Sequence, residues 1–349
     1  MQLPDDSYYD CGSVHVLNQT DMFKKNISHK TCMLKAKALK SGDTIGFISP
    51  SNPISDEKKE LLDNTVEVLH GFGFSTQFGK NAFSTDTYGV SGGEPLERAS
   101  DINAMFADPG IEAIWCAQGG STANQVLDHL DYDVIRKNPK VFIGLSDNTV
   151  LINAIHHKTG LITFHGTDAK KGREGQYFDS PYSHEEFRRR FLEKETGAIR
   201  KNSTWRCIRK GKAKGRILGG NILCFLKLAG TPYMPNLQDA LLILEDYHMK
   251  VTQALMTITQ LRQMGIFNKI AGVVVGHVYG FDQDTKFDAK GNRVYFEDIL
   301  LRETVDYDFP ILKIHEFGHK CPSTFLPIGS EAEIDADNLS LSLTESCLT

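Results

Sequence analysis

The first half of the chain alternates between short apolar segments and longer amphipathic ones, and this alternation restricts the possible folds more than any other feature. Strand-like segments occupy residues 44–49, 74–79, 111–120, 140–146 and 161–166. The intervals between them have mostly helical periodicity. Because parallel strands need long crossovers, usually helices, we predict a Rossmann-like α/β domain over residues 33–167, with a mostly parallel sheet and helices on both faces.

Composition divides the rest of the chain. Residues 1–32 lack apolar periodicity and are expected to form a polar tail. Residues 168–214 are rich in Lys, Arg, Gly, Ser and Glu, which predicts a linker or lid. Residues 215–349 combine five apolar strand-like segments with the helical segments GNILCFLKLAG and KVTQALMTITQLRQMG. They predict a β-rich, barrel-like α+β domain.

Charge and cysteine content narrow the functional classes. The net charge of -5 gives no reason to expect nucleic acid or an anionic membrane as partner. The basic run within residues 168–214 is accompanied by acidic residues, which favours a solvated connector. Seven cysteines without a CxxC pair, and an N-terminus without the apolar run of a signal peptide, indicate a reducing compartment and hence the cytoplasm.

Ser146 follows a predicted strand and precedes a predicted helix. Its hydroxyl would project above the carboxyl edge of the sheet, where the helix N-terminus favours a developing oxyanion. The alternative is that Ser146 only caps the helix. A second glycine turn, Gly119 and Gly120, ends the strand at residues 111–120 and is expected to lie beside Ser146, although it could also be an ordinary tight turn.

A serine nucleophile needs a base and a carboxylate that orients the base. His319 and Glu245 qualify because each follows or ends an apolar strand in the second half of the chain. The alternatives are Asp246 for the carboxylate and three other histidines for the base: His165, His248 and His277.

Residues 315–319 read HEFGH, which matches the HExxH pattern of zinc peptidases. That pattern binds zinc because a helix places both histidines on one face. Here β-like residues precede it, Gly318 lies inside it and Pro322 follows, so we do not interpret it as a zinc site, and we expect no metal or other cofactor.

Several segments in order resemble one family. These are GDTIGFISPS, CAQGGST, FIGLSDNT, LITFHGT, GRILGGN, LLILED and FGHKCPSTFLPIG. From about Leu39 to near the C-terminus, the chain resembles the LD-carboxypeptidases and the related microcin C immunity proteins, a family of serine peptidases. The resemblance implies a homodimer and a triad of Ser146, Glu245 and His319, with the oxyanion held by the backbone of Asp147 and of the Gly119 and Gly120 turn.

One departure concerns the substrate. LD-carboxypeptidases usually read RGGYG where this chain has residues 118–122, QGGST. The main expectation is release of terminal D-alanine from muropeptide tetrapeptide stems through an acyl-enzyme. The alternative, which the departure favours, is cleavage of aminoacyl-nucleotide analogues, as in the immunity proteins. A third hypothesis is a non-catalytic protein that binds a peptide or nucleotide.

Overall fold

The predicted parallel sheet is present in the computed structural model, which describes residues 33–169 and 178–349. The predicted tail and residues 170–177 of the predicted linker lie outside the described residues. The sheet has the order β14-β5-β4-β3-β1-β2. Its strands are β1 (Thr44–Ile48), β2 (Ser75–Phe78), β3 (Ala113–Cys116), β4 (Val141–Gly144), β5 (Thr163–His165) and β14 (Leu326–Ile328).

Strands β1 to β5 pair in parallel, because a crossover follows each of the first four. The crossovers contain the helices α1 (Asp56–Gly71), α2 (Pro95–Ala107), α3 (Tyr132–Lys137) and α4 (Thr149–Thr159), and the 3-10 helices η2 (Ala123–His129) and η3 (Ser146–Asn148). Along β3, Ile114 packs into one apolar core and Trp115 into the other, so both faces of the sheet are covered.

Strand β14 was not foreseen, because its residues lie in a segment expected to be a loop. It comes from the second half of the chain and pairs antiparallel with β5 of the first half, with Leu326 opposite His165. The first sheet therefore ends on a strand that is about 160 residues away from its neighbour in sequence.

The second sheet has eight strands in the order β6-β16-β15-β8-β9-β10-β13-β7. Their bounds are β6 (Gly197–Ala198), β7 (Arg206–Arg209), β8 (Lys212–Asn221), β9 (Ala240–Asp246), β10 (Gly272–Val278), β13 (Ile311–Gly318), β15 (Glu331–Asp335) and β16 (Ser340–Leu343). The central strands β8, β9, β10 and β13 are parallel, and the outer ones are antiparallel.

This sheet is open, which corrects the barrel-like part of the expectation. In the described part of the chain its end strands, β6 and β7, do not pair with each other. Helical crossovers join the four central strands and produce an open parallel centre instead of a closed meander. The remaining helices are α5 (Pro181–Phe187), the π-helix η4 (Arg188–Leu192), α6 (Ile222–Phe225), η5 (Leu226–Leu228), α7 (Val251–Gln263), η6 (Ile266–Asn268) and α8 (Phe296–Glu303), and β11 (Lys286–Phe287) with β12 (Arg293–Val294) forms a hairpin.

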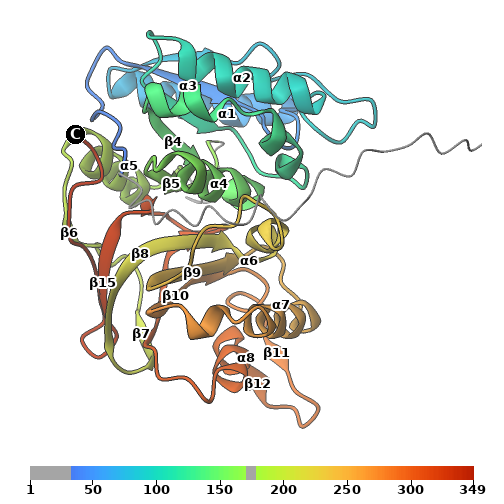
Figure 1. Ribbon diagram of the computed structural model, residues 1–349, viewed down its shortest axis with the longest axis vertical. Coiled ribbons are helices and arrows are strands. Elements are labelled where there is room, and N and C mark those ends of the chain that lie inside the picture. Colours follow the sequence, from blue (N-terminus) through green and yellow to red (C-terminus); the bar gives the residue numbers. More distant parts are fainter. Residues whose placement is uncertain (1–32, 170–177) are drawn as a thin grey trace, which may run out of the picture. The chain divides into compact units, whose positions relative to one another are not determined.

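Helix α4 lies between the two sheets (Figure 1). It contacts β5 of the first sheet and β8 of the second, and nine of its eleven residues are buried. Asn153 on α4 donates to the carbonyl of Gly219 on β8 at 2.8 Å and accepts from its N–H at 3.1 Å. This reciprocal pair fixes the second sheet against the helix that follows Ser146.

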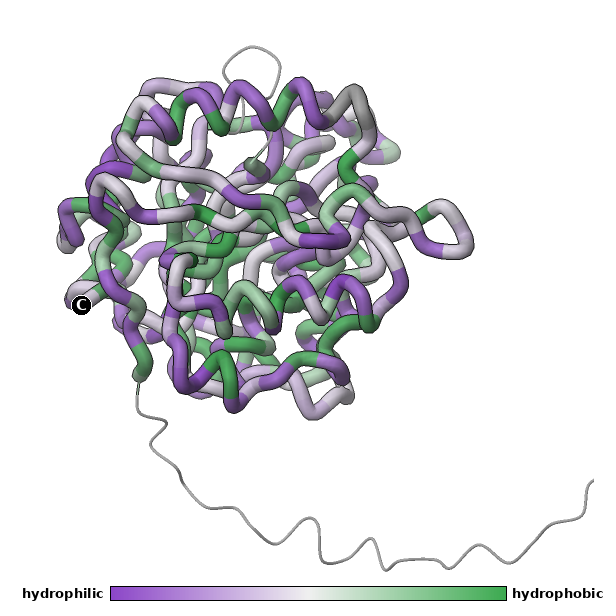
Figure 2. The backbone as a smooth tube through the Cα atoms, turned by 90° about the horizontal axis from the view of Figure 1, so that it is seen from above, coloured by the Kyte–Doolittle hydropathy of each residue, from purple (hydrophilic) through white to green (hydrophobic). Residues whose placement is uncertain are grey.

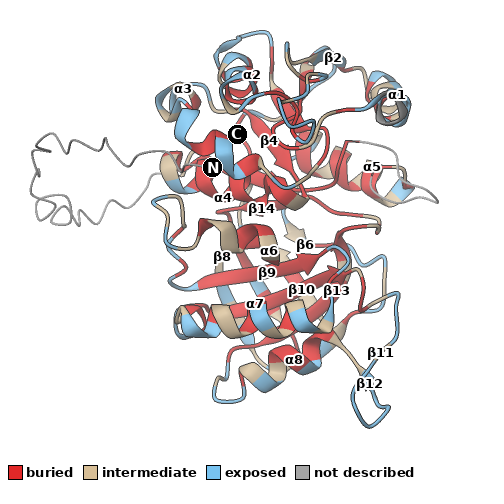
Figure 3. Ribbon diagram, turned by 90° about the vertical axis from the view of Figure 1, so that its right-hand side faces the viewer, coloured by how far each residue is buried: buried red, intermediate tan, exposed pale blue. Residues whose placement is uncertain are grey.

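The distribution of buried residues follows the two sheets. The strands at the centre of both sheets are buried, whereas α7 and α8 expose one side (Figure 3). Hydrophobic segments of the backbone run through the middle of the molecule, between hydrophilic ones (Figure 2). No helix in the described residues is long and apolar enough to span a bilayer.

Candidate active site

The carboxyl ends of β1, β3 and β4 meet at one edge of the first sheet. The order β2-β1-β3-β4-β5 changes direction between β1 and β3, and open α/β sheets bind ligands beyond the strand ends at such a point. Ser51 follows β1, Gly119 follows β3 and Ser146 follows β4. The topology thus brings three turns together at one place.

Ser146 has a left-handed backbone conformation, with φ of 61°, which is uncommon for a residue with a side chain. Leu145 before it is extended, and η3 begins at Ser146 and leads into α4. Helix α4 has Asn148 as its N-cap residue, so Ser146 does not fill that role. A half-buried serine on a strained strand-to-helix turn has the backbone geometry of a nucleophile elbow.

The glycine turn after β3 lies directly against Ser146. A Cβ on Gly119 would fall 2.5 Å from Ser146 Cβ and 2.7 Å from its Oγ, and 3.3 Å from the backbone nitrogen of Asp147. A Cβ on Gly120 would collide with the side chains of Ser51 and Asn52. The residues that the sequence predicted around the oxyanion are therefore in contact, and a side chain on Gly119 would clash with Ser146.

The Asp147 carboxylate, which the sequence did not single out, ties these turns together. It is fully buried and accepts from Ser51 Oγ at 2.6 Å and from Ala123 N at 2.7 Å. Lys227 Nζ, from the second half of the chain, forms an ion pair with it and also donates to Ser121 O at 2.9 Å. The signal in the sequence was the aspartate directly after Ser146, because a carboxylate buried at that turn would need hydrogen-bond donors around it.

Glu245 and His319 form a direct hydrogen bond. Glu245, near the end of β9, is fully buried, and His319 follows β13 after Gly318, whose φ of 121° requires glycine. His319 Nδ1 donates to Glu245 Oε2 at 2.6 Å. This bond places the imidazole proton on Nδ1 and leaves Nε2 free to accept a proton.

The electrostatics of the pair support this tautomer. Burial would raise the pKa of Glu245, but the nearby His319 and His165 lower it to about 2. Burial would lower the pKa of His319, but the Glu245 carboxylate raises it above the ordinary value of 6.5. The carboxylate is thus ionised and makes the imidazole a stronger base.

The hydrogen bonds of the Asp246 side chain go to the backbone and not to His319. The Asp246 carboxylate accepts from Tyr247 N at 2.7 Å and from Leu223 N at 3.3 Å. Burial and the charge of Glu245 raise its pKa to about 7. Of the two adjacent carboxylates, the structure places Glu245 against His319, in keeping with the alternation of side chains along a strand.

The other candidate histidines have different surroundings. His277 donates from Nδ1 to the backbone carbonyl of His319 at 2.6 Å, and His248 is exposed and packs against Tyr279. Tyr247 stacks on the His319 ring, with centroids 4.9 Å apart, and is 40% exposed. It provides an aromatic surface beside the histidine that the sequence did not indicate.

The HEFGH segment is not helical, as predicted, and so lacks the geometry of a zinc peptidase; strand β13 extends through Gly318, further than the expected end at His315. Residues Ile311–Gly318 form β13, and Glu316 accepts from the buried Trp205 side chain at 2.7 Å. His315 instead approaches His277 and Asp282, and the donor atoms of these three lie within 4.8 Å of one another. Lys313 Nζ already donates to Asp282 at 2.7 Å, so a buried ammonium provides the positive charge there.

The predicted site residues therefore form two groups, Ser146 with Gly119, Gly120 and Asp147, and Glu245 with His319. In the described residues, Ser146 Oγ and His319 form no direct hydrogen bond. Such bonds are often long in unliganded enzymes. Contacts between the two sheets lie near both groups: Asn221 N on β8 donates to Thr149 Oγ1 on α4 at 3.1 Å, and His165 on β5 lies 3.8 Å from Glu245 on β9.

Gln118, where the resemblance leads to an arginine, is turned toward the loop after β1. Its side-chain amide donates to the backbone carbonyl of Asn52 at 3.1 Å and to that of Pro53. Gln118 is buried, so the departure changes the inner support of the glycine turn.

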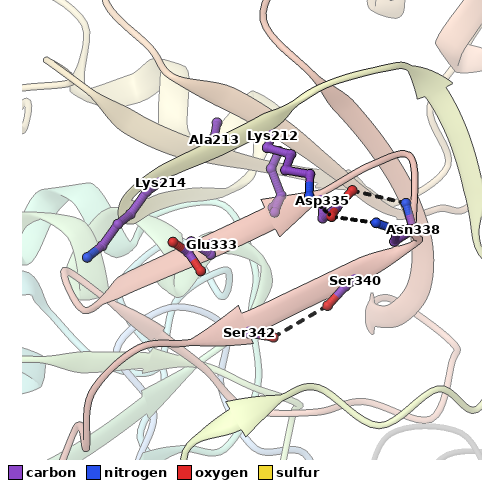
Figure 4. A pocket seen from close by; sticks show the side chains of 9 residues that line it. Lys212, Ala213, Lys214, Glu333, Asp335, Asn338, Ser340 and Ser342 are labelled. Carbon is purple, nitrogen blue, oxygen red and sulfur yellow. Dashed lines mark hydrogen bonds and ion pairs between the residues drawn. The ribbon is translucent and has the colours of Figure 1, made fainter.

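A polar hollow on the second sheet is a separate feature. Its lining comes from β8, β15 and β16 and the turn between the last two, and the side chains pair with one another, as Lys212 does with Asp335 at 2.8 Å (Figure 4). None of the predicted site residues lines this hollow.

Two family models match the chain. The LD-carboxypeptidase N-terminal domain matches residues 45–166, and the LD-carboxypeptidase C-terminal domain matches residues 214–334.

Curated relatives cover nearly the whole chain. A Bacillus subtilis (strain 168) protein named as a probable murein peptide carboxypeptidase is 32% identical over 86% of this chain and 91% of its own length. The Escherichia coli microcin C7 self-immunity protein MccF is 30% identical over 90% of this chain and 97% of its own length. A solved structure of MccF in complex with aspartyl sulfamoyl adenosine has a TM-score of 0.81 at 28% identity, covering 90% of this chain and all of the other.

Proposed function

The chain belongs to the LD-carboxypeptidase family, and from this premise we propose that it hydrolyses an amide bond. In this proposal Ser146 is the nucleophile, His319 is the base and Glu245 orients His319. The observation that carries the proposal is the 2.6 Å bond from His319 Nδ1 to the buried Glu245. It leaves Nε2 as the basic atom, as a serine mechanism requires.

In the proposed reaction, His319 Nε2 removes the proton of Ser146 as its Oγ attacks the substrate carbonyl. The backbone N–H of Asp147 and those of the Gly119 and Gly120 turn stabilise the negative oxygen. His319 then returns the proton to the leaving amine, and the acyl group remains on Ser146. Water, deprotonated by the same histidine, releases the acyl group and restores the serine.

The main substrate proposal is a muropeptide tetrapeptide stem that loses its terminal D-alanine. Support comes from the B. subtilis relative, which is named as a probable murein peptide carboxypeptidase, and from the matches to the two LD-carboxypeptidase domain models. The chain would then act in the cytoplasm, as a homodimer, on peptides from wall recycling. Light scattering of the purified protein tests the dimer.

Aminoacyl-nucleotide analogues are the second candidate, favoured by two observations. MccF is a relative at 30% identity, and the QGGST turn has Gln118 bonded to the loop after β1. Tyr247, exposed beside His319, offers a surface on which a planar base could stack. The scissile bond would join the aminoacyl carboxyl group to the nucleotide part.

A substrate panel separates these candidates. The purified protein is incubated with murein tetrapeptide and with an aminoacyl sulfamoyl adenosine, and products are identified by mass spectrometry, with Ser146→Ala as control. Release of D-alanine supports the first proposal, and release of the amino acid from the nucleoside supports the second. Binding without turnover of either by the unaltered protein would favour a non-catalytic binding protein, and activity lost in a chelator would revive a metal mechanism.

A further inference from the structure

His165 is a fully buried histidine without a hydrogen-bond partner. In the described part of the chain, neither of its ring nitrogens has a partner, and neither does Glu245 Oε1. The two unpartnered groups face each other, with His165 Nε2 3.8 Å from Glu245 Oε1. Leaving a buried polar group unpaired is unfavourable, so two such groups that face each other call for an explanation.

The location of His165 connects the two groups of the active site. It is the last residue of β5, and it pairs with Gly144 on β4, two residues before Ser146. Glu245, by contrast, lies on β9 in the second sheet. His165 therefore extends from the sheet that carries the serine to the carboxylate that orients His319.

The surroundings of the His165 ring leave it little room to turn. The Phe317 ring packs edge-on against it, at 90° with centroids 5.7 Å apart. A Cβ on Gly220 would come within 2.8 Å of His165 Cδ2, so only glycine fits on that side. The ring is thus fixed with Nε2 toward Glu245.

Resting on the proposed function, we propose that His165 is a positioning residue, whose Nε2–H donates to Glu245 Oε1 during turnover and holds the carboxylate on His319. Glu245 then has one histidine on each oxygen. No proton moves through His165, which acts only as a hydrogen-bond donor from Nε2. Its role is to prevent the carboxylate from rotating when His319 takes the proton of Ser146.

The charge on Glu245 is shared under this arrangement. A donor on Oε1 stabilises the carboxylate and reduces the extent to which the carboxylate raises the pKa of His319. The other titratable groups around the pair include Asp246, Asp168, Cys224, Cys321, His277 and Tyr247. Loss of the His165 donor should therefore leave more of the carboxylate charge to act on His319 and raise the pKa of His319, which moves the acidic limb of the pH profile to higher pH.

Two substitutions of similar size test this role. The amide nitrogen of His165→Gln can take the place of Nε2, whereas that of His165→Asn is too short to reach Glu245. We expect His165→Asn to lower kcat about ten- to hundredfold, with KM little changed and the acidic limb shifted upward. His165→Gln should recover most of kcat and the original limb.

A matched control is His156→Gln. His156 is also buried, but its Nδ1 bonds to the carbonyl of Leu161 at 3.0 Å, within the helix-to-strand turn. This variant should lower the melting temperature without moving the pH limb. Equal loss of kcat in both His165 variants with an unmoved limb would show a merely structural role and overturn the proposal, as would an unchanged kcat in a folded His165→Asn.

A spectroscopic readout separates this proposal from the proposed function. The proton between His319 Nδ1 and Glu245 should give a downfield NMR resonance, which needs no substrate. We expect it to be retained in Ser146→Ala and His165→Gln and lost or shifted in His165→Asn. If His165→Asn does not fold, His165→Gln decides alone, and loss of the resonance there overturns the role of His165. Turnover by Ser146→Ala would instead overturn the proposed function.

Discussion

The two halves of the candidate site are built in different ways. The serine side is assembled by one parallel sheet, in which turns after neighbouring strands converge at the carboxyl edge. The histidine side depends on a hydrogen bond between residues 74 positions apart, one near the end of β9 and the other after β13. The first half is fixed by local backbone geometry, and the second by a buried hydrogen bond to a carboxylate.

Because of this difference, substitutions in the two halves should reduce activity for different physical reasons. A change on the serine side should act through sterics, because Gly119 and Ser146 are in contact. A change on the histidine side should act through protonation, because Glu245 and His319 shift each other's pKa.

The largest effect is expected from removal of the proposed nucleophile. Ser146→Ala should lower kcat by about 10⁴- to 10⁶-fold and leave substrate binding nearly intact, because the hydroxyl acts only in the chemical step. Single-turnover kinetics and a binding titration measure the two quantities. Turnover close to that of the unaltered protein would exclude Ser146 from the mechanism.

Glu245→Gln should lower kcat by about 10³- to 10⁴-fold. The amide would donate where the carboxylate accepts, so His319 would adopt the wrong tautomer. Steady-state kinetics on the better substrate measure the loss, with Asp246→Asn as the matched control. If the two variants lost activity equally, the choice of Glu245 as the orienting group would be wrong.

Gly119→Ala tests the steric side and should lower kcat about 10²- to 10³-fold. The added methyl group would lie 2.5 Å from Ser146 Cβ and would displace the oxyanion donors. The pH profile should not move, because no charged group is altered. A shifted acidic limb would contradict the division of the site into a steric and an electrostatic half.

The pH dependence tests the histidine side. Because the pKa of His319 is raised above 6.5, kcat/KM should fall about tenfold per pH unit below a limb that lies above that value.

The stability of the fold should also depend on pH. The pKa of Glu245 is lowered from 4.5 to about 2, so its contribution is present above pH 4.5 and lost as the pH falls toward 2. Acid unfolding of Glu245→Gln should lack this part of the transition.

The smallest effect is expected where the halves are joined by charge. Lys227→Met removes the cation paired with the buried Asp147 and should reduce stability by about 1–3 kcal/mol and kcat only a few-fold. Lys212→Met, at the exposed pair with Asp335, is the matched control and should change neither. Urea unfolding measures the stability of both variants. Equal stability would show that the ion pair of Asp147 with Lys227 does not help to hold the turns together.

Sequence reasoning reached the parallel sheet because periodicity is local, and most strands of both sheets lie where apolar runs predicted them. It could not exclude barrel closure, since whether β6 meets β7 depends on long-range geometry. The serine turn was visible for the same local reason. The partners of Asp147 were not, because Lys227 follows it by 80 residues with no motif between.

The resemblance was needed to choose among the candidate histidines. His165, His277 and His319 each follow or end a strand, and composition does not distinguish them. Their neighbours do, since His319 meets a carboxylate at 2.6 Å and His277 meets a carbonyl. Such pairings depend on register between strands distant in sequence, which periodicity does not encode.

Strand β14 has a consequence for synthesis of the chain. Until Leu326–Ile328 leave the ribosome, β5 has no partner on its outer side and is an open edge of the first sheet. We expect the nascent first half to be prone to association with other chains and to be stabilised only by the last tenth of the sequence. Expression of residues 33–167 alone should therefore yield aggregated material, whereas co-expression with the second half should recover soluble protein.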